Sequence, residues 1–106
     1  MNRWNIPHWL EKAVMERDRA CIYCAVSFST PTTRRGDRPS WEHIVNDESI
    51  VTLTNIARCC LSCNASKGAK LLRDWLQSPY CLRKNICGAT VAPVVRQALL
   101  SDSANQ

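Results

Sequence analysis

The sequence predicts a small α+β fold in which two short strands lie between helical segments. Its 106 residues suffice for one domain with a modest core. Residues 40–45 and 56–60 are expected as the strands, whereas apolar residues recur at helical spacing closer to both ends. Cys-x-x-Cys pairs before and after the first strand could staple so small a core through a metal ion. We therefore expect residues 1–106 to form a single domain with its core at about 19–70.

The first expected element is a helix over residues 5–17. Asn5 can cap it, and Pro7 is tolerated in the first turn, where no N–H partner is needed. Apolar residues then follow at helical spacing, namely Trp9, Leu10, Ala13 and Val14. The pattern indicates a helix that covers one side of the core. Segment 29–39, rich in Pro, Thr, Gly and Arg, is expected as a loop or hairpin turn.

Helical segments are also expected after the second strand. One helix begins near Ser62, which can cap it, and Gly68 interrupts or ends it. Further helices are expected at about residues 70–100. In order, this part comprises an amphipathic helix that stops before Pro79, an irregular segment at 80–88, a last helix at 90–100 and a frayed tail at 101–106.

Composition restricts the classes of function. The formal net charge is +5, from 14 Lys and Arg against 9 Asp and Glu, and such a basic domain is attracted to polyanions, of which nucleic acid is the commonest. No apolar run approaches the ~18 residues of a membrane span, so we expect no membrane partner. The first residues lack the apolar stretch of a secretion signal. We therefore expect a cytoplasmic location, in which thiols stay reduced.

The cysteine spacing predicts a structural zinc site. Two residues between cysteines let one tight turn direct both sulfurs at one ion, and two such pairs complete a tetrahedral site. The alternative is that the cysteines are simply buried thiols. Cys59 competes with Cys60 as a ligand, but the tighter spacing favours Cys60. The expected zinc ligands are Cys21, Cys24, Cys60 and Cys63, whereas Cys81 and Cys87 are expected as small hydrophobes.

A second group of residues suits phosphodiester hydrolysis. The reaction needs a base that takes a proton from water and a cation that offsets charge on the phosphate and the leaving oxygen. Neutral His43 suits the first task, because its pKa lies near working pH. Glu42 and Asn64 supply oxygens for a hard cation such as Mg²⁺ or Mn²⁺.

One segment begins with Trp41-Glu-His-Ile44, passes through Asn55 and ends with Cys60-Leu-Ser-Cys-Asn64-Ala-Ser-Lys67. This segment resembles the HNH nucleases. The resemblance covers roughly residues 19–70 and implies a ββα-metal core. It implies that His43 is the general base, that Asn55 orients this histidine, and that Asn64 occupies the third motif position, as in the HNN variant. It also implies that Glu42 is the acidic ligand of the catalytic cation.

Basic residues surround this segment and predict where DNA would lie. They would contact phosphates and position the duplex rather than distinguish bases. A solvated basic loop without a nucleic-acid role is the alternative for the arginines. The predicted DNA-contacting residues are Arg34, Arg35, Arg38, Lys67 and Lys70.

The predicted function is therefore that of a metal-dependent DNA endonuclease. By its resemblance to the HNH family, the products would carry 5′-phosphate and 3′-hydroxyl ends. One alternative is a non-catalytic zinc module that binds DNA without cutting it. Another is a nuclease subunit that requires a partner protein. One active site cuts one strand, so double-strand cleavage would need two events or two subunits, and the sequence leaves open a homodimer or a larger phage or host complex.

Overall fold

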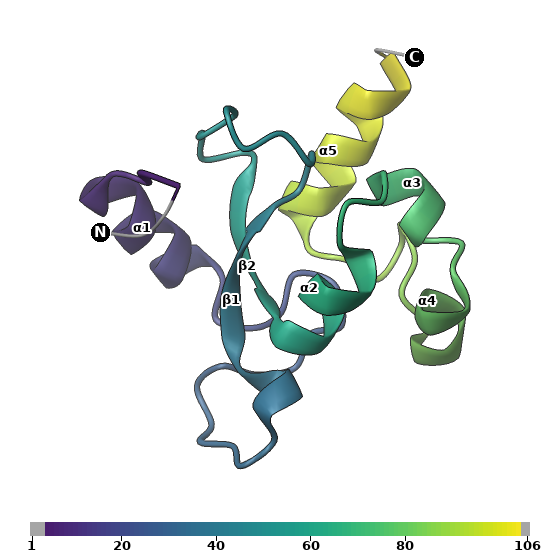
Figure 1. Ribbon diagram of the computed structural model, residues 1–106, viewed down its shortest axis with the longest axis horizontal. Helices are drawn as coiled ribbons and strands as arrows, with labels where there is room; N and C mark the ends of the chain where they lie inside the picture. The colour runs from purple at the N-terminus through teal and green to yellow at the C-terminus, as the bar shows by residue number, and fades with distance from the viewer. Residues whose placement is uncertain (1–3, 105–106) are drawn as a thin grey trace.

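A two-stranded antiparallel hairpin lies at the centre of the protein in a computed structural model that describes residues 4–104 (Figure 1). Strand β1 spans Pro39–His43 and strand β2 spans Ile56–Cys60, with Pro39 opposite Cys60 and His43 opposite Ile56. Strand β2 has the predicted bounds, and β1 ends two residues before the predicted end at residue 45. Helices and this sheet together confirm the predicted α+β class.

Helix α1, His8–Arg17, packs against one face of the hairpin (Figure 1). Its buried Leu10 and Val14 form a small apolar cluster with Ile56. The helix starts three residues later than predicted, because Asn5 adopts a left-handed conformation with φ of 56° and Pro7 occupies the cap position. Arg17 donates to the backbone oxygen of Ile56 at 2.9 Å, which fixes the end of α1 against β2.

Helix α2, Leu61–Lys67, follows β2 without an intervening loop. Its cap is Cys60 rather than the predicted Ser62, since the Cys60 Sγ accepts a hydrogen bond from the Cys63 N–H at 3.4 Å. Gly68 ends the helix, as predicted, with a φ of 50° that side chains disfavour. The same cysteine therefore ends a strand, caps a helix and contributes a sulfur to the candidate metal centre.

Further helices follow: α3 at Leu72–Trp75, α4 at Pro79–Lys84 and α5 at Pro93–Ala104. Helix α4 falls inside the segment predicted as irregular, because Ser78 accepts a hydrogen bond from the Cys81 N–H and Pro79 supplies a first-turn residue. Helix α5 starts three residues later than predicted and continues into the predicted tail; residues 105–106 of that tail lie outside the described residues.

The larger apolar core lies on the other face of the hairpin from α1 (Figure 1). Trp75 of α3 and Val95 of α5 are fully buried there, together with Ala57 of β2 and the first cysteine segment. The Ala92 N–H donates to the Ile22 oxygen at 2.9 Å, which links the C-terminal part to that segment. None of the helices described over residues 4–104 is long and apolar enough to cross a bilayer.

The arginine-rich loop contains a short 3₁₀ turn, η1, at Arg35–Asp37. Gly36 lies so close to the start of α2 that a Cβ there would overlap the Ser62 hydroxyl. The Leu61 N–H also donates to the Arg38 oxygen at 2.9 Å. The loop is thus attached to the hairpin–α2 unit while its arginine side chains are exposed.

Candidate functional site

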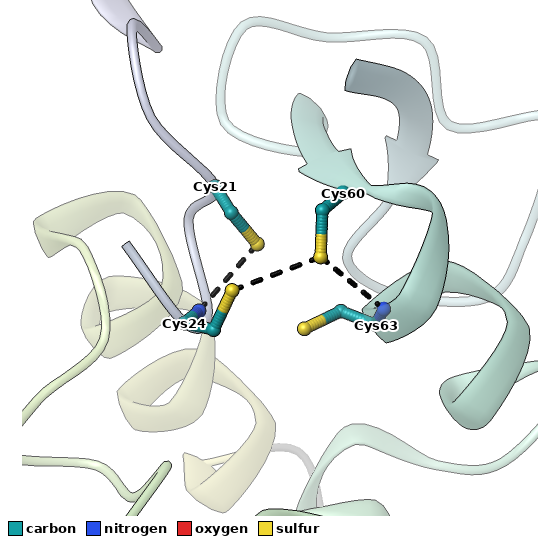
Figure 2. A group of neighbouring side chains, drawn as sticks. All are labelled: Cys21, Cys24, Cys60 and Cys63. Atoms are coloured by element: carbon teal, nitrogen blue, oxygen red, sulfur yellow. Dashed lines mark hydrogen bonds between the residues drawn. The ribbon is translucent and has the colours of Figure 1, made fainter. Parts of the chain in front are cut away.

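Four cysteines from two distant parts of the chain converge on one point (Figure 2). Their sulfur atoms all lie within 4.8 Å of one another. One pair comes from the segment after α1, and the other from the junction of β2 and α2. These residues are the predicted ligands Cys21, Cys24, Cys60 and Cys63.

Local backbone geometry directs each pair of sulfurs inward. The N–H groups of Tyr23 and Cys24 both donate to the Cys21 Sγ at 3.4 Å, as the Cys63 N–H does to Cys60. Ala25 closes the first turn in a left-handed conformation, with its N–H bonded to the Cys21 oxygen at 3.0 Å. Amide donors of this kind stabilise thiolates. The donor set and its closeness therefore fit a metal ion such as zinc.

The remaining cysteines lie apart from this cluster. Cys59 is buried, and its sulfur lies 3.8 Å from the Ser40 hydroxyl. Successive side chains of a strand point to opposite faces, so Cys59 points away from Cys60. Cys60 is therefore the member of the cluster, as the tighter cysteine spacing predicted. Burial raises the pKa of Cys59, which keeps it a neutral thiol. Cys81 is a small buried hydrophobe, as predicted. Cys87 is exposed, so the prediction that it serves as a small hydrophobe is wrong.

A groove of about 760 Å³ runs beside β1 and brings together the predicted base His43 and the predicted cation ligands Glu42 and Asn64, whereas Asn55 does not line it. Over the described residues the sheet has two strands, so β1 has no strand on this side, and α2 and the 46–48 turn form the groove walls. The lining residues include Glu42 and His43 from the end of β1, Asn64 from α2, and Asn46 and Glu48 from the turn.

One ring nitrogen of His43 has no hydrogen-bond partner among the described residues. This atom, Nε2, is buried. The ring packs edge-on against Trp4, with centroids 5.5 Å apart. Burial lowers the pKa of His43, which favours the neutral imidazole that a general base requires. An unsatisfied buried nitrogen costs about 1–3 kcal/mol, and a catalytic role is one of the explanations for such a group.

Asn55 holds the turn that follows β1. Its amide oxygen accepts from the Val45 N–H at 2.7 Å, and its amide nitrogen donates to the oxygens of Val45 and Ile50 at 3.2 and 3.0 Å. The Ile44 N–H donates to the backbone oxygen of Asn55 at 3.0 Å, so the backbone pairing of the two strands continues beyond His43. These bonds fix the chain immediately after the histidine and support an orienting role for Asn55.

Asn64 connects α2 to β1 at the groove. Its amide nitrogen donates to the Ser40 hydroxyl at 2.9 Å and to the Trp41 oxygen at 3.1 Å. Because a backbone carbonyl can only accept, the nitrogen must occupy this side of the amide. The amide oxygen therefore lies on the opposite side of the group, away from these two acceptors.

Glu42 belongs to a buried polar triad with Tyr23 and Lys67. Its Oε2 accepts from the Tyr23 hydroxyl at 2.6 Å and lies 3.1 Å from the Lys67 Nζ. Burial, with Glu42 beside it, raises the pKa of Tyr23, so that the phenol stays protonated and donates. Lys67 is only 1% exposed. The prediction that Lys67 contacts DNA is therefore wrong, because its ammonium group is bound to Glu42 and to the His43 oxygen inside the protein.

The other predicted DNA-contacting residues are exposed. Arg34 pairs loosely with Asp37, at 3.6 Å, while keeping most of its side chain in solvent. Lys70 is exposed just after α2 and donates to the Ser66 oxygen. Arg35 and Arg38 are exposed on the loop that enters β1. These side chains are accessible to a polyanion.

Sequence patterns alone did not point to Tyr23 or Glu48. Tyr23 lies within the first Cys-x-x-Cys pair, where an aromatic residue gives no indication of a contact with a strand 19 residues away. Glu48 lines the groove from an exposed turn whose conformation the sequence did not define. The only indication in the sequence was that Glu48 is an acidic residue in the turn that follows His43.

Comparison with known proteins yields no identification. No family model, curated protein or solved structure matches the chain.

Proposed function

We propose that the chain is a metal-dependent DNA endonuclease of the HNH type, with zinc at the four-cysteine cluster. One observation carries the proposal: Glu42, His43 and Asn64, predicted from the motif, line one groove although they come from two elements. A chance resemblance in the sequence would not require Asn64 to line the same groove as Glu42 and His43. The adjacent four-cysteine cluster supports the zinc assignment, because four thiols with Cys-x-x-Cys spacing form the closed type of zinc site.

In this proposal His43 accepts a proton from the attacking water. Asn55 keeps the histidine in place by fixing the turn behind it. The oxygens of Glu42 and Asn64 would hold Mg²⁺ or Mn²⁺, a cation that when bound offsets charge on the phosphate and the leaving oxygen. Arg34, Arg35 and Arg38 hold the phosphate backbone, because their exposed guanidinium groups lie on the loop that leads into β1.

A cleavage assay on supercoiled plasmid tests the proposal. Zinc-loaded protein should convert the plasmid to nicked or linear DNA with Mg²⁺ or Mn²⁺, and should be inactive when the added cation is omitted. Omission is a better control than a chelator, because a chelator also competes for the zinc. The ends should be ligatable without treatment if the products carry 5′-phosphate and 3′-hydroxyl groups.

The alternative is a non-catalytic DNA-binding module or a subunit that needs a partner. The Lys67–Glu42 ion pair favours it, since a carboxylate already neutralised by an ammonium group attracts a cation less strongly. Salt-dependent DNA binding without cleavage at any Mg²⁺ or Mn²⁺ concentration would support this alternative and contradict the enzyme.

A further inference from the structure

Tyr23 joins the four-cysteine cluster to the groove. It lies between the ligands Cys21 and Cys24, and its N–H donates to the Cys21 Sγ. Its hydroxyl meanwhile donates to the Glu42 Oε2 at 2.6 Å. The ring is 1% exposed and packs edge-on against Trp75, with centroids 4.8 Å apart, so it has no room to rotate away. The backbone position of Tyr23 is therefore set at the cluster, and its hydroxyl sets the position of a groove carboxylate.

The second cysteine pair acts on the same oxygen. Cys60 caps α2, and Lys67 at the end of that short helix places its Nζ 3.1 Å from the Glu42 Oε2. Both halves of the cluster thus hold Oε2, which leaves Oε1 as the atom that can face the groove. If the cluster lost its ion, the Tyr23 turn and α2 would no longer be held together, and the carboxylate would lose both restraints.

We propose that Tyr23 is a positioning residue that makes cation binding at Glu42 depend on metal loading of the four-cysteine cluster. The inference rests on the proposed function, and it adds to that function a link between the two metal sites. Groups that orient a ligand typically change metal affinity by about 10- to 100-fold when removed. Loss of the Tyr23 hydroxyl should accordingly weaken cation binding without removing any ligand.

The test compares Tyr23→Phe with Tyr80→Phe. These are the only two tyrosines, and both contact the cysteine cluster: the Tyr23 N–H donates to the Cys21 Sγ, and the Tyr80 hydroxyl lies 3.2 Å from the Cys63 Sγ. Of the two, Tyr23 is the one bonded to Glu42. We expect Tyr23→Phe to retain one zinc per chain but to need about 10- to 100-fold more Mn²⁺ for half-maximal cleavage, with the rate restored at saturation. Tyr80→Phe should reach half-maximal cleavage at the same Mn²⁺ concentration, the Mn²⁺ midpoint, as the parent protein.

A double variant tests whether Tyr23 acts through the carboxylate. In a Glu42→Gln background, adding Tyr23→Phe should shift the Mn²⁺ midpoint by less than about twofold, because the two changes share one interaction. Equal midpoint shifts for Tyr23→Phe and Tyr80→Phe, or an additive double variant, would overturn the inference. An unchanged midpoint in Tyr23→Phe would overturn it while leaving the nuclease proposal intact.

A measurement on the parent protein covers the case in which Tyr23→Phe does not fold. With the tyrosine Cζ carbons labelled with ¹³C, Mg²⁺ titration should shift the Tyr23 resonance and leave the Tyr80 resonance in place, since cation binding at Glu42 alters its hydrogen bond. A parent protein that cleaves DNA but shows no Tyr23 shift contradicts the inference. A parent that neither cleaves nor shifts contradicts the proposed function and the inference together.

Discussion

At the scale of single residues, the buried Glu42–Lys67 pair is the feature that most affects stability. Both side chains are almost completely buried, and the Tyr23 hydroxyl satisfies the carboxylate further. Burying two charges is costly, so the pair itself adds little net stability compared with an apolar pair. Removing one partner is different, because the other charge is then buried without compensation.

We therefore expect Lys67→Ala to lower the free energy of unfolding by about 3–5 kcal/mol. Lys70→Ala is the matched control, because Lys70 lies three residues further on and is exposed. Its effect should stay within about 0.5 kcal/mol. Urea denaturation of the zinc-loaded proteins measures both. Equal effects of the two substitutions would show that Lys67 is not buried as described.

At the scale of elements, the first cysteine turn and the β2–α2 junction depend on each other. Neither segment is long enough to hold its shape alone, and their sulfurs meet across 35 intervening residues. Ligation of four thiols can contribute on the order of 10 kcal/mol of folding free energy in small zinc domains. The cluster is thus expected to be required for the fold.

Cys63→Ser should consequently lose the metal and yield unfolded or aggregated protein, whereas Cys59→Ala should retain one zinc per chain. Cys59 is an informative control because it is equally buried and adjacent to Cys60, a proposed zinc ligand. Elemental analysis of purified protein gives the zinc content, and circular dichroism the fold. Well-folded parent protein without zinc would contradict the assignment of the cluster as a zinc site. Loss of zinc in Cys59→Ala would show that Cys59, and not Cys60, is the zinc ligand.

The arginine loop is the element expected to determine DNA affinity. Replacing Arg34, Arg35 and Arg38 by Ala should weaken binding and lower the slope of log affinity against log salt by about 1 for each phosphate that is no longer bound. The control replaces Arg83, Lys84 and Arg96, exposed on α4 and α5, which removes the same net charge elsewhere. Binding measured at several ionic strengths distinguishes the loop from a general charge effect. Identical slopes for both triple variants would count against a DNA-binding role of the loop.

Sequence patterns predicted the hairpin and the cysteine pairs well, because both depend on short spacings. The β2 bounds and each of the two cysteine pairs follow directly from residues that are neighbours in the chain. The burial of Lys67 could not be predicted in this way. It depends on the distance from α2 to β1, which is set by packing between elements.

Local preferences misplaced the start of α1 and left α4 unpredicted for a similar reason. Asn5 is a good cap residue, but the chain turns there in a left-handed conformation and α1 begins at His8. Ser78 and Pro79 form a standard helix start within a segment expected to be irregular. The co-location of Glu42, His43 and Asn64 was predicted through the resemblance to a family, and its catalytic meaning remains a prediction.

At the scale of the whole molecule, the four-cysteine cluster joins the elements that build the groove in which we propose that a cation binds. The cluster side supplies Tyr23 and α2, and the free edge of β1 supplies His43. A net charge of +5 attracts the molecule to a polyanion, and the exposed arginines lie on the loop leading to that groove. Cleavage with His43 as the base is the proposed step that connects these parts.

The sharpest comparison is between His43→Ala and His8→Ala, since these are the only two histidines and His8 is exposed on α1. Both variants should keep zinc, fold and DNA binding. We predict that His43→Ala lowers the rate of plasmid nicking about 10²–10⁴-fold, the range expected when a general base is lost, and that His8→Ala keeps the parent rate. Nicking by His43→Ala at the parent rate, in a preparation free of contaminating nuclease, would contradict the role of His43 as the base.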